Sequence, residues 1–206
     1  MMVFGRALPP NIRYIAGIDE AGRGPLAGPV SIGIVVVPLT HNKMVVEALS
    51  GVRDSKQLSP QRRAWWRKEA MRLMQENIIA SATALVGPRY IDKNGIVPAI
   101  HLGIIRVLRR LNISPSHTHI LLDGGLRAPS YFASQETIIR GDSSELLISL
   151  ASILAKVRRD NYMVNLSKNM PEYGFEHHKG YGTKEHMRTI KKYGVSSIHR
   201  RYFIHL

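Results

Sequence analysis

Two apolar runs rich in β-branched residues lie close together near the start of the chain and restrict its fold more than any other feature. They cover residues 13–19 and 28–37, and the glycine-rich segment 21–25 separates them. β-Branched side chains pack well on a pleated sheet, so each run favours a strand over a helix. We therefore predict two neighbouring strands joined by a short glycine-rich connection.

Helical and strand-like patterns alternate through the rest of the chain. Ser59 and Pro60 supply a start signal for a helix over residues 61–76. Apolar residues recur at helical spacing over residues 97–111 and form one continuous stripe over residues 145–165, which is the strongest helical pattern. Short apolar segments predict further strands over residues 78–86, 119–122 and 136–139. This mixture predicts the α/β class of fold.

The composition changes after Pro171. The remaining chain is rich in Gly, His, Lys, Arg and Tyr, and we predict one helix in it, near residues 183–193. We therefore divide the chain into a catalytic domain over residues 1–170 and a small substrate-binding lobe over residues 171–206. A chain of 206 residues is long enough to bury one substantial core.

The charge balance predicts a polyanionic partner. Twenty-nine Lys and Arg face fifteen Asp and Glu, a net charge of +14, and such an excess attracts phosphates. The absence of cysteine excludes disulfides and zinc held by thiolates. The apolar stretches are too short to cross a bilayer, and no secretion signal is recognisable, so we expect a cytoplasmic protein with no membrane contact.

Acidic residues stand where predicted strands end. Asp19 and Glu20 follow one apolar strand, Asp123 follows another, and Asp142 precedes the long helix. Carboxylates delivered to one rim by separate elements are the oxygen ligands that Mg²⁺ and Mn²⁺ prefer. Two such ions can hydrolyse a phosphodiester. The sequence therefore suggests a metal site built from these four acids.

Two of the acids also have structural interpretations. Asp123 precedes Gly124 and could belong to a turn, while Asp142 and Glu145 have the spacing of a helix capping box. Asp19 and Glu20 are harder to explain structurally, because adjacent acids repel one another.

Glycine, basic and aromatic residues surround the acids in the sequence. Gly22, Arg23 and Gly24 follow Glu20 directly, and glycines let a ligand approach the backbone, although they also suit an ordinary tight connection. Cations alternate with aromatic rings in the segments 177–181 and 199–203, a pattern suited to phosphates and bases. Lys56, Arg62 and Arg63 form another basic group, which a solvated surface would explain equally well.

At this level of detail the chain resembles the ribonuclease HII family over about residues 12–203. The most specific block opens the match and contains the first two acids. The matching blocks occur in the family's order, and they are Gly17–Val30, Asp54–Ser59, Leu122–Gly124, Gly141–Ser143, Ala151–Asp160, Tyr173–Phe175 and His178–Thr183, with His199, Arg200 and Phe203 at the end.

The resemblance implies a ribonuclease H-like fold, a mixed sheet flanked by helices with a C-terminal helical extension. It also implies a metal-dependent endonuclease that uses Mg²⁺ or Mn²⁺ and cuts on the 5′ side of a ribonucleotide, leaving 3′-hydroxyl and 5′-phosphate ends. The substrates would be RNA–DNA hybrids and single ribonucleotides embedded in duplex DNA. We expect a monomer.

The resemblance also assigns roles to individual residues. Asp19, Glu20, Asp123 and Asp142 would be the catalytic metal ligands. Gly22, Arg23 and Gly24 would recognise the ribose 2′-hydroxyl, the group that separates RNA from DNA. Tyr181 would pack on the adjoining deoxyribose, Lys56 would contact a backbone phosphate, and Ser152 and Lys156, one helical turn apart, would face a common phosphate.

Two other classes of function are compatible with parts of this pattern. A basic nucleic-acid-binding module without catalysis would explain the charge but not four acids. Another metal nuclease of the same fold, such as a resolvase or an exonuclease, would explain the acids but would also act on a substrate without ribose.

Overall fold

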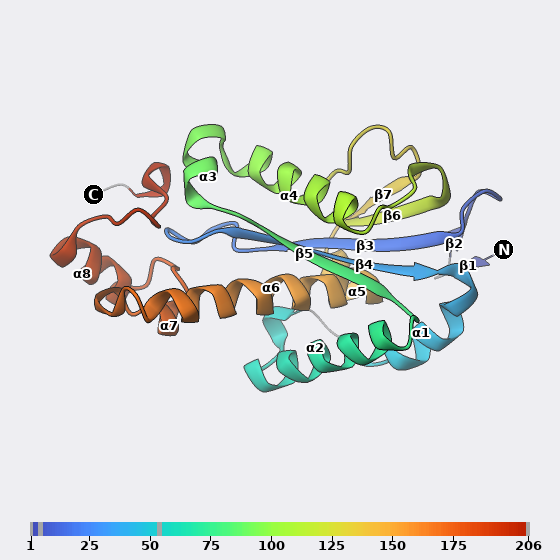
Figure 1. Ribbon diagram of the computed structural model, residues 1–206, viewed down its shortest axis with the longest axis horizontal. Coiled ribbons are helices and arrows are strands. Elements are labelled where there is room, and N and C mark those ends of the chain that lie inside the picture. Colours follow the sequence, from blue (N-terminus) through green and yellow to red (C-terminus); the bar gives the residue numbers. More distant parts are fainter. Residues whose placement is uncertain (1, 4–5, 53–54, 205–206) are drawn as a thin grey trace.

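A mixed five-stranded sheet forms the centre of the molecule in the computed structural model, which describes residues 2–3, 6–52 and 55–204. Its strand order is β5-β4-β3-β6-β7 (Figure 1). β3 pairs antiparallel with β4, β4 pairs antiparallel with β5, and β3, β6 and β7 run parallel. The strands are β3 (Tyr14–Ala21), β4 (Val30–Pro38), β5 (Ala80–Val86), β6 (Thr118–Asp123) and β7 (Gln135–Ile138).

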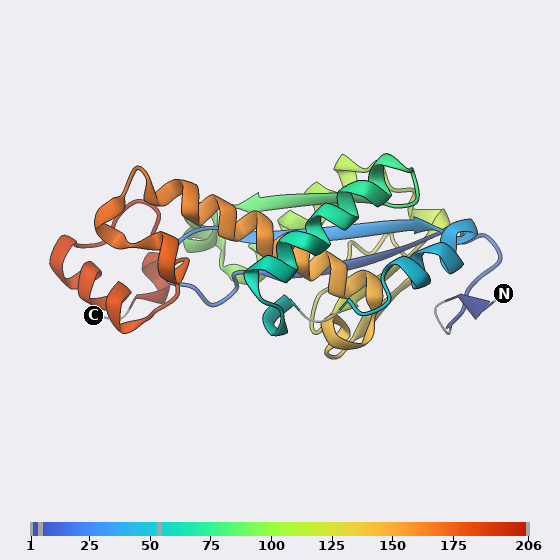
Figure 2. The ribbon, with the colours of Figure 1, turned by 90° about the horizontal axis from the view of Figure 1, so that it is seen from below.

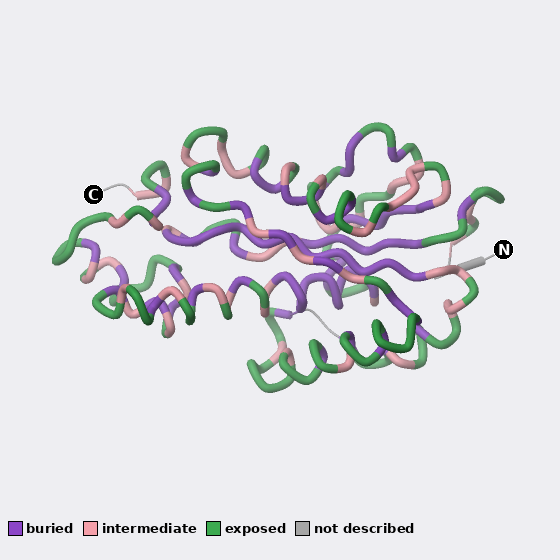
Figure 3. Tube along the Cα trace, in the orientation of Figure 1, coloured by how far each residue is buried: buried purple, intermediate pink, exposed green. Residues whose placement is uncertain are grey.

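Helices cover both faces of this sheet. On one face lie α3 (Pro88–Asn94) and α4 (Ile96–Arg110), and on the other lie α1 (Asn42–Ala48), α2 (Pro60–Gln75) and α6 (Leu146–Ser167) (Figures 1 and 2). Among the strands, β4, β6 and the middle of β3 are almost continuously buried, whereas β5 alternates and β7 is partly exposed (Figure 3). Shorter elements complete the described chain: β1 (Met2–Val3), β2 (Arg6–Ala7), α5 (Gly141–Ser144), α7 (Phe175–His178), α8 (Lys184–Tyr193) and five 3₁₀ turns, η1 (Leu39–His41), η2 (Ser55–Gln57), η3 (Pro115–His117), η4 (Pro171–Tyr173) and η5 (Arg201–Phe203).

All nine elements predicted from the sequence are present, with ends within two residues of the predicted ones. The predicted α/β class is confirmed. The sequence did not predict α1, α3, α5 or α7, because each has at most seven residues. Two helical turns offer too few apolar positions for a period of 3.6 to stand out.

Two glycines let α6 lie directly against the sheet. A Cβ built on Gly17 of β3 would stand 2.4 Å from the backbone carbon of Leu147, and one built on Gly33 of β4 would stand 2.3 Å from the carbonyl oxygen of Ala151. Neither position leaves room for a methyl group, since backbone atoms cannot yield as a flexible side chain can. The close approach fixes the start of α6 relative to the ends of β3 and β6.

The segment after residue 170 packs against the far end of α6 (Figure 1). There a small separate core contains Ala27, Met163, Tyr173 and Phe175. This core draws on the glycine-rich connection and on α6 as well as on the C-terminal segment. The division into two domains at residue 170 therefore stays a prediction, because this core joins residues from both sides of it. Among the described helices, none is both long and apolar enough to cross a membrane.

Candidate metal centre and adjoining loop

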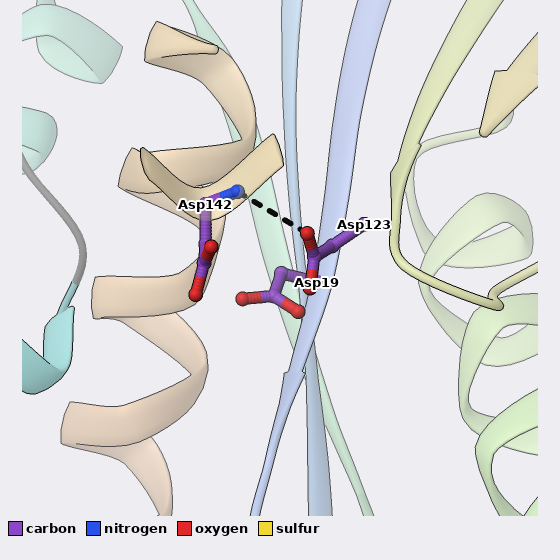
Figure 4. Close-up of side chains that lie close together, drawn as sticks. All are labelled: Asp19, Asp123 and Asp142. Atoms are coloured by element: carbon purple, nitrogen blue, oxygen red, sulfur yellow. Dashed lines mark hydrogen bonds between the residues drawn. The ribbon is translucent and has the colours of Figure 1, made fainter. Parts of the chain in front are cut away.

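Three aspartates from distant parts of the chain meet at one edge of the sheet. Asp19 lies on β3, Asp123 ends the neighbouring parallel strand β6, and Asp142 lies in α5. One carboxylate oxygen from each lies within 4.8 Å of the other two (Figure 4). The backbone N–H of Asp142 donates a 3.3 Å hydrogen bond to Oδ1 of Asp123, which ties α5 to the end of β6 (Figure 4). The ends of parallel strands meet at one edge, which explains the first pair, and α5 adds the third.

The carboxylate of Asp142 does not cap a helix. α6 begins after Glu145, and no side chain caps its first turn. Asp142 instead lies inside α5, and its carbonyl accepts a 2.7 Å hydrogen bond from the hydroxyl of Ser149 on α6. The capping-box interpretation is therefore wrong. Backbone bonding holds α5 in place and directs the Asp142 carboxylate toward the other two acids.

The electrostatics of this group favour a bound cation. Asp19 is 3% exposed, and burial, reinforced by the charges of Glu20 and Asp123, raises the pKa of its carboxyl well above the ordinary range. Burial also raises the pKa of Asp123. Lys56 Nζ lies 3.1 Å from Asp142 Oδ2, but this lysine side chain is 77% exposed and solvent screens it. Three hard oxygen donors with this much uncompensated charge fit a divalent cation such as Mg²⁺ or Mn²⁺.

Glu20, the residue after Asp19, is not one of the three acids whose oxygens lie within 4.8 Å of one another. Its carboxyl nevertheless interacts with the neighbouring carboxyl of Asp19, and its charge is, after burial, the second cause of the raised pKa of Asp19. Burial raises the pKa of Glu20, while the guanidinium of Arg23, 3.5 Å away, lowers it and the charge of Asp123 raises it. Glu20 therefore interacts with two of the three aspartates, Asp19 and Asp123, and a four-ligand site stays a prediction.

The loop that follows Glu20 has one buried and one open glycine. Gly22 has a φ of +89°, and a Cβ there would stand 2.0 Å from Nε of Arg159. The fold itself therefore requires glycine at this position. Gly24 is exposed, and a Cβ there would meet no atom within 4 Å. The space beside Gly24 is open to a ligand.

The other predicted substrate-binding residues differ in exposure. Tyr181 is 41% exposed, and Lys156 Nζ lies 5.6 Å from its ring centre while pairing with Asp160 at 2.8 Å. Ser152 is buried, and its hydroxyl lies 2.7 Å from that of Ser55. Ser152 therefore connects α6 to η2 in the interior, whereas Lys156 and Tyr181 are partly exposed at the surface.

Several residues predicted as phosphate contacts face the interior instead. The basic and aromatic segments 177–181 and 199–203 contribute three buried side chains, those of His178, His199 and Arg200. Arg63 donates hydrogen bonds to the carbonyls of Ser55 and Leu58 and so shapes the turn that carries Lys56. Their sequence pattern resembled a surface patch because charge alone does not reveal burial. Asp54, part of the same matching block, lies outside the described residues.

A pair of buried histidines, His186 and His199, joins two parts of the C-terminal segment by hydrogen bonds. His199 Nδ1 accepts a 3.0 Å hydrogen bond from the backbone N–H of Ser196, so its proton lies on Nε2. That Nε2 lies 3.1 Å from Nε2 of His186, whose Nδ1 donates to the carbonyl of Tyr181 at 2.9 Å. This chain of bonds requires both rings to be neutral, and burial lowers the pKa of each to about 4.

The two histidines predict a loss of stability in acid. Between the ordinary pKa of 6.5 and the folded value of about 4, the unfolded chain binds protons that the folded protein excludes. The free energy of unfolding therefore falls as the pH falls through this window, by about 1.4 kcal/mol per pH unit for each histidine. Urea unfolding at about pH 7 and about pH 5 measures the fall.

The matched variants are His186→Gln and His101→Gln. His101 is exposed on α4, so its replacement should leave the pH dependence unchanged. His186→Gln should reduce the fall in the free energy of unfolding between about pH 7 and about pH 5. An equal fall in the wild type and both variants would contradict the assignment of this pH dependence to the histidine pair.

A five-stranded mixed sheet flanked by helices, with aspartates at the ends of two adjacent parallel strands, defines a ribonuclease H-like fold. The structure superposes with a TM-score of 0.67 on ribonuclease H2 from Pyrococcus horikoshii, at 29% identity, over 92% of this chain and 93% of that one. It superposes with a TM-score of 0.73 on ribonuclease HII from Archaeoglobus fulgidus, at 21% identity, over 93% and 96% of the two chains.

The family model of ribonuclease HII matches residues 16–206. A ribonuclease HII from Caldicellulosiruptor bescii is 43% identical over 97% of this chain and 90% of its own length. One from Bacillus cytotoxicus is 41% identical over 94% of this chain and 69% of its own length. The chain belongs to the ribonuclease HII family and is a ribonuclease H endonuclease.

Proposed function

We propose that this endonuclease hydrolyses the phosphodiester on the 5′ side of a ribonucleotide and leaves 3′-hydroxyl and 5′-phosphate ends. Its substrates would be RNA–DNA hybrids and single ribonucleotides embedded in duplex DNA. The observation that carries this proposal is the position of the aspartate group beside an exposed glycine loop in a chain of charge +14. One place on the protein would then attract phosphates, bind metal ions and give a ribose access to the backbone.

The residues divide the chemical work between them. Asp19, Asp123 and Asp142 would hold Mg²⁺ or Mn²⁺, with Glu20 as the fourth acid. Two such ions, when bound, activate water and offset negative charge on the leaving 3′-oxygen. The ammonium of Lys56, beside Asp142, would attract the adjoining phosphate.

The recognition of the sugar would use a separate set. The open backbone at Arg23 and Gly24 would approach the 2′-hydroxyl, and the exposed ring of Tyr181 would pack on the neighbouring sugar. Lys156 lies against that ring, where its charge can reach the phosphate between the two sugars. Ser152 would act indirectly, since its hydroxyl bonds to Ser55 and, while burial raises the pKa of Asp19, a hydrogen bond from Ser152 offsets part of that rise.

Cleavage of one defined duplex tests this proposal. The substrate contains a single internal ribonucleotide, and the control is the same duplex in deoxyribose throughout. With Mg²⁺ or Mn²⁺ we expect one product, cut at the 5′ side of the ribonucleotide, and no product in a chelator or from the control. Cutting of the all-DNA duplex would indicate another metal nuclease, and salt-sensitive binding without product would indicate a non-catalytic module.

Replacing Gly24 with alanine should weaken substrate binding without weakening the fold. The added methyl group meets no protein atom, so the melting temperature should not change. The same methyl group occupies the space where the ribose would approach the backbone, and we expect KM to rise about tenfold, the equivalent of one lost hydrogen bond. Steady-state kinetics on the single-ribonucleotide duplex, with a thermal melt of each protein, makes the comparison.

Gly22→Ala supplies the contrast, since its methyl group would overlap Arg159 and should lower the melting temperature. Unchanged kinetic constants in Gly24→Ala would show that this loop does not contact the substrate.

A further inference from the structure

Two guanidinium groups are fully buried beneath the glycine-rich loop. Arg159 on α6 and Arg200 near the C-terminus are both 0% exposed. Within the described residues, neither forms a salt bridge with a carboxylate, and both bind backbone carbonyls instead. Burial, together with the positive charge of Arg159, lowers the pKa of Arg200 to about 9. Two unpaired like charges in the interior are costly, and neutral side chains of similar volume would pack more favourably.

Arg200 uses all three of its nitrogen positions on one short stretch of chain. Its Nη2 donates to the carbonyl of Gly22 at 2.7 Å, its Nη1 to that of Arg23 at 2.8 Å, and its Nε to that of Gly28 at 2.8 Å. A rigid planar fork therefore sets the orientation of two consecutive peptide units, those after Gly22 and after Arg23.

Arg159 holds the other end of the same loop. It donates to the carbonyls of Ala27 and Pro29 and, at 3.0 Å, to that of Lys179, two residues before Tyr181. The two arginines thus fasten the loop and the C-terminal segment to the end of α6.

The two peptide units held by Arg200 direct their N–H groups away from it. In a trans peptide the C=O of one residue and the N–H of the next point in opposite directions. Because the carbonyls of Gly22 and Arg23 point inward to Arg200, the N–H groups of Arg23 and Gly24 point outward. Both residues are exposed, and neither N–H donates to an acceptor among the described residues. Bonds between their carbonyls and a cation also make these N–H groups stronger donors.

We propose that Arg200 is a positioning residue for ribose recognition: it fixes two peptide planes so that the N–H groups of Arg23 and Gly24 meet the ribose at the cleavage site. The inference rests on the proposed function, because it assumes that this loop faces the sugar. Arg200 itself is buried and touches no substrate. Its effect is on the difference in affinity between a ribonucleotide and a deoxyribonucleotide at one position.

The test measures that difference directly. Dissociation constants are determined in chelator, where no cleavage occurs, for two duplexes that differ in one 2′-hydroxyl. The variants are Arg200→Met, which removes every donor, and Arg200→Lys, whose single ammonium cannot hold three carbonyls. Arg201→Met is the matched control, since it removes the same charge from the adjacent exposed side chain.

We expect the preference for the ribonucleotide duplex to fall about tenfold in Arg200→Met and by less in Arg200→Lys, as loss of one hydrogen bond implies. Arg201→Met should weaken binding of both duplexes equally and keep the preference. A purely structural role would lower the melting temperature of Arg200→Lys but leave its preference at the wild-type value, and that result would overturn the inference. If Arg200→Met does not fold, Arg200→Lys decides alone.

The two proposals fail in different ways. Wild-type protein that neither prefers nor cuts the ribonucleotide duplex would overturn the proposed function. Wild-type protein that does both, together with Arg200 variants that retain its full preference, would overturn the role of Arg200 alone.

Discussion

Replacing Asp19 with asparagine is expected to abolish metal-dependent cleavage while leaving the metal-free protein at least as stable as the wild type. The side chain keeps its shape, but one of the three carboxylates of the aspartate group is lost. We expect a rate loss on the order of 10³-fold or more, equivalent to about 4 kcal/mol of transition-state stabilisation. Stability should hold because burial already disfavours the charged form of Asp19, and a neutral amide removes that cost.

Thermal melts with and without Mg²⁺ or Mn²⁺ separate these effects. In the wild type, bound metal should raise the melting temperature because it binds the folded chain alone. Asp19→Asn should lose that rise together with the activity. Glu47→Gln, which removes an exposed acid from α1, should keep both. Full activity in Asp19→Asn would contradict the assignment of the site.

Replacing Gly17 with alanine should have the largest effect on the fold. A methyl group at this position would overlap the backbone of Leu147, so α6 must move away from β3. Overpacking of this kind costs about 3 kcal/mol, and for a chain of this size each kcal/mol lowers the melting temperature by about 2–4 °C. We therefore expect a decrease of roughly 6–12 °C.

The same displacement should reduce activity in the molecules that remain folded. α5, which carries Asp142, is bonded to α6 through Ser149, so a shift of α6 separates Asp142 from Asp19. Differential scanning calorimetry and cleavage assays below the melting point measure the two effects. Gly87→Ala is the control, since its methyl group meets no atom within 4 Å. A melting temperature for Gly17→Ala equal to that of Gly87→Ala would show that the helix does not depend on this glycine.

The long elements of the fold could be predicted from the sequence because their patterns repeat over many residues. α6, with twenty-two residues, and the pair β3 and β4 are examples. α5, with four residues, has no such repeat, and it forms because Gly141 and Ser149 bond it to the start of α6. The position of Asp142 could therefore not be derived from its local sequence, where a capping box was an equally good interpretation.

The buried polar residues were the least predictable. Arg200 and His199 lie in a segment whose charge and aromatic content suggested a surface for phosphates, yet both are in the interior. Whether an arginine faces solvent or a set of carbonyls depends on what other segments bring to it, and the carbonyls of Gly22, Arg23 and Gly28 lie more than 170 residues away in the chain.

The sequence by itself determined the α/β class, the strands that end in acids, the excess of positive charge and the resemblance to the ribonuclease HII family. These follow from local periodicity, composition and the order of motifs, which a linear chain already contains. The tertiary structure alone decided that Asp19, Asp123 and Asp142 converge to within 4.8 Å, with Glu20 close enough to interact with Asp19 and Asp123. It also decided that Arg200 lies beneath the loop after Glu20. The physical reason is that convergence depends on strand register, on the close approach of α6 through Gly17 and Gly33, and on backbone groups that meet only after folding.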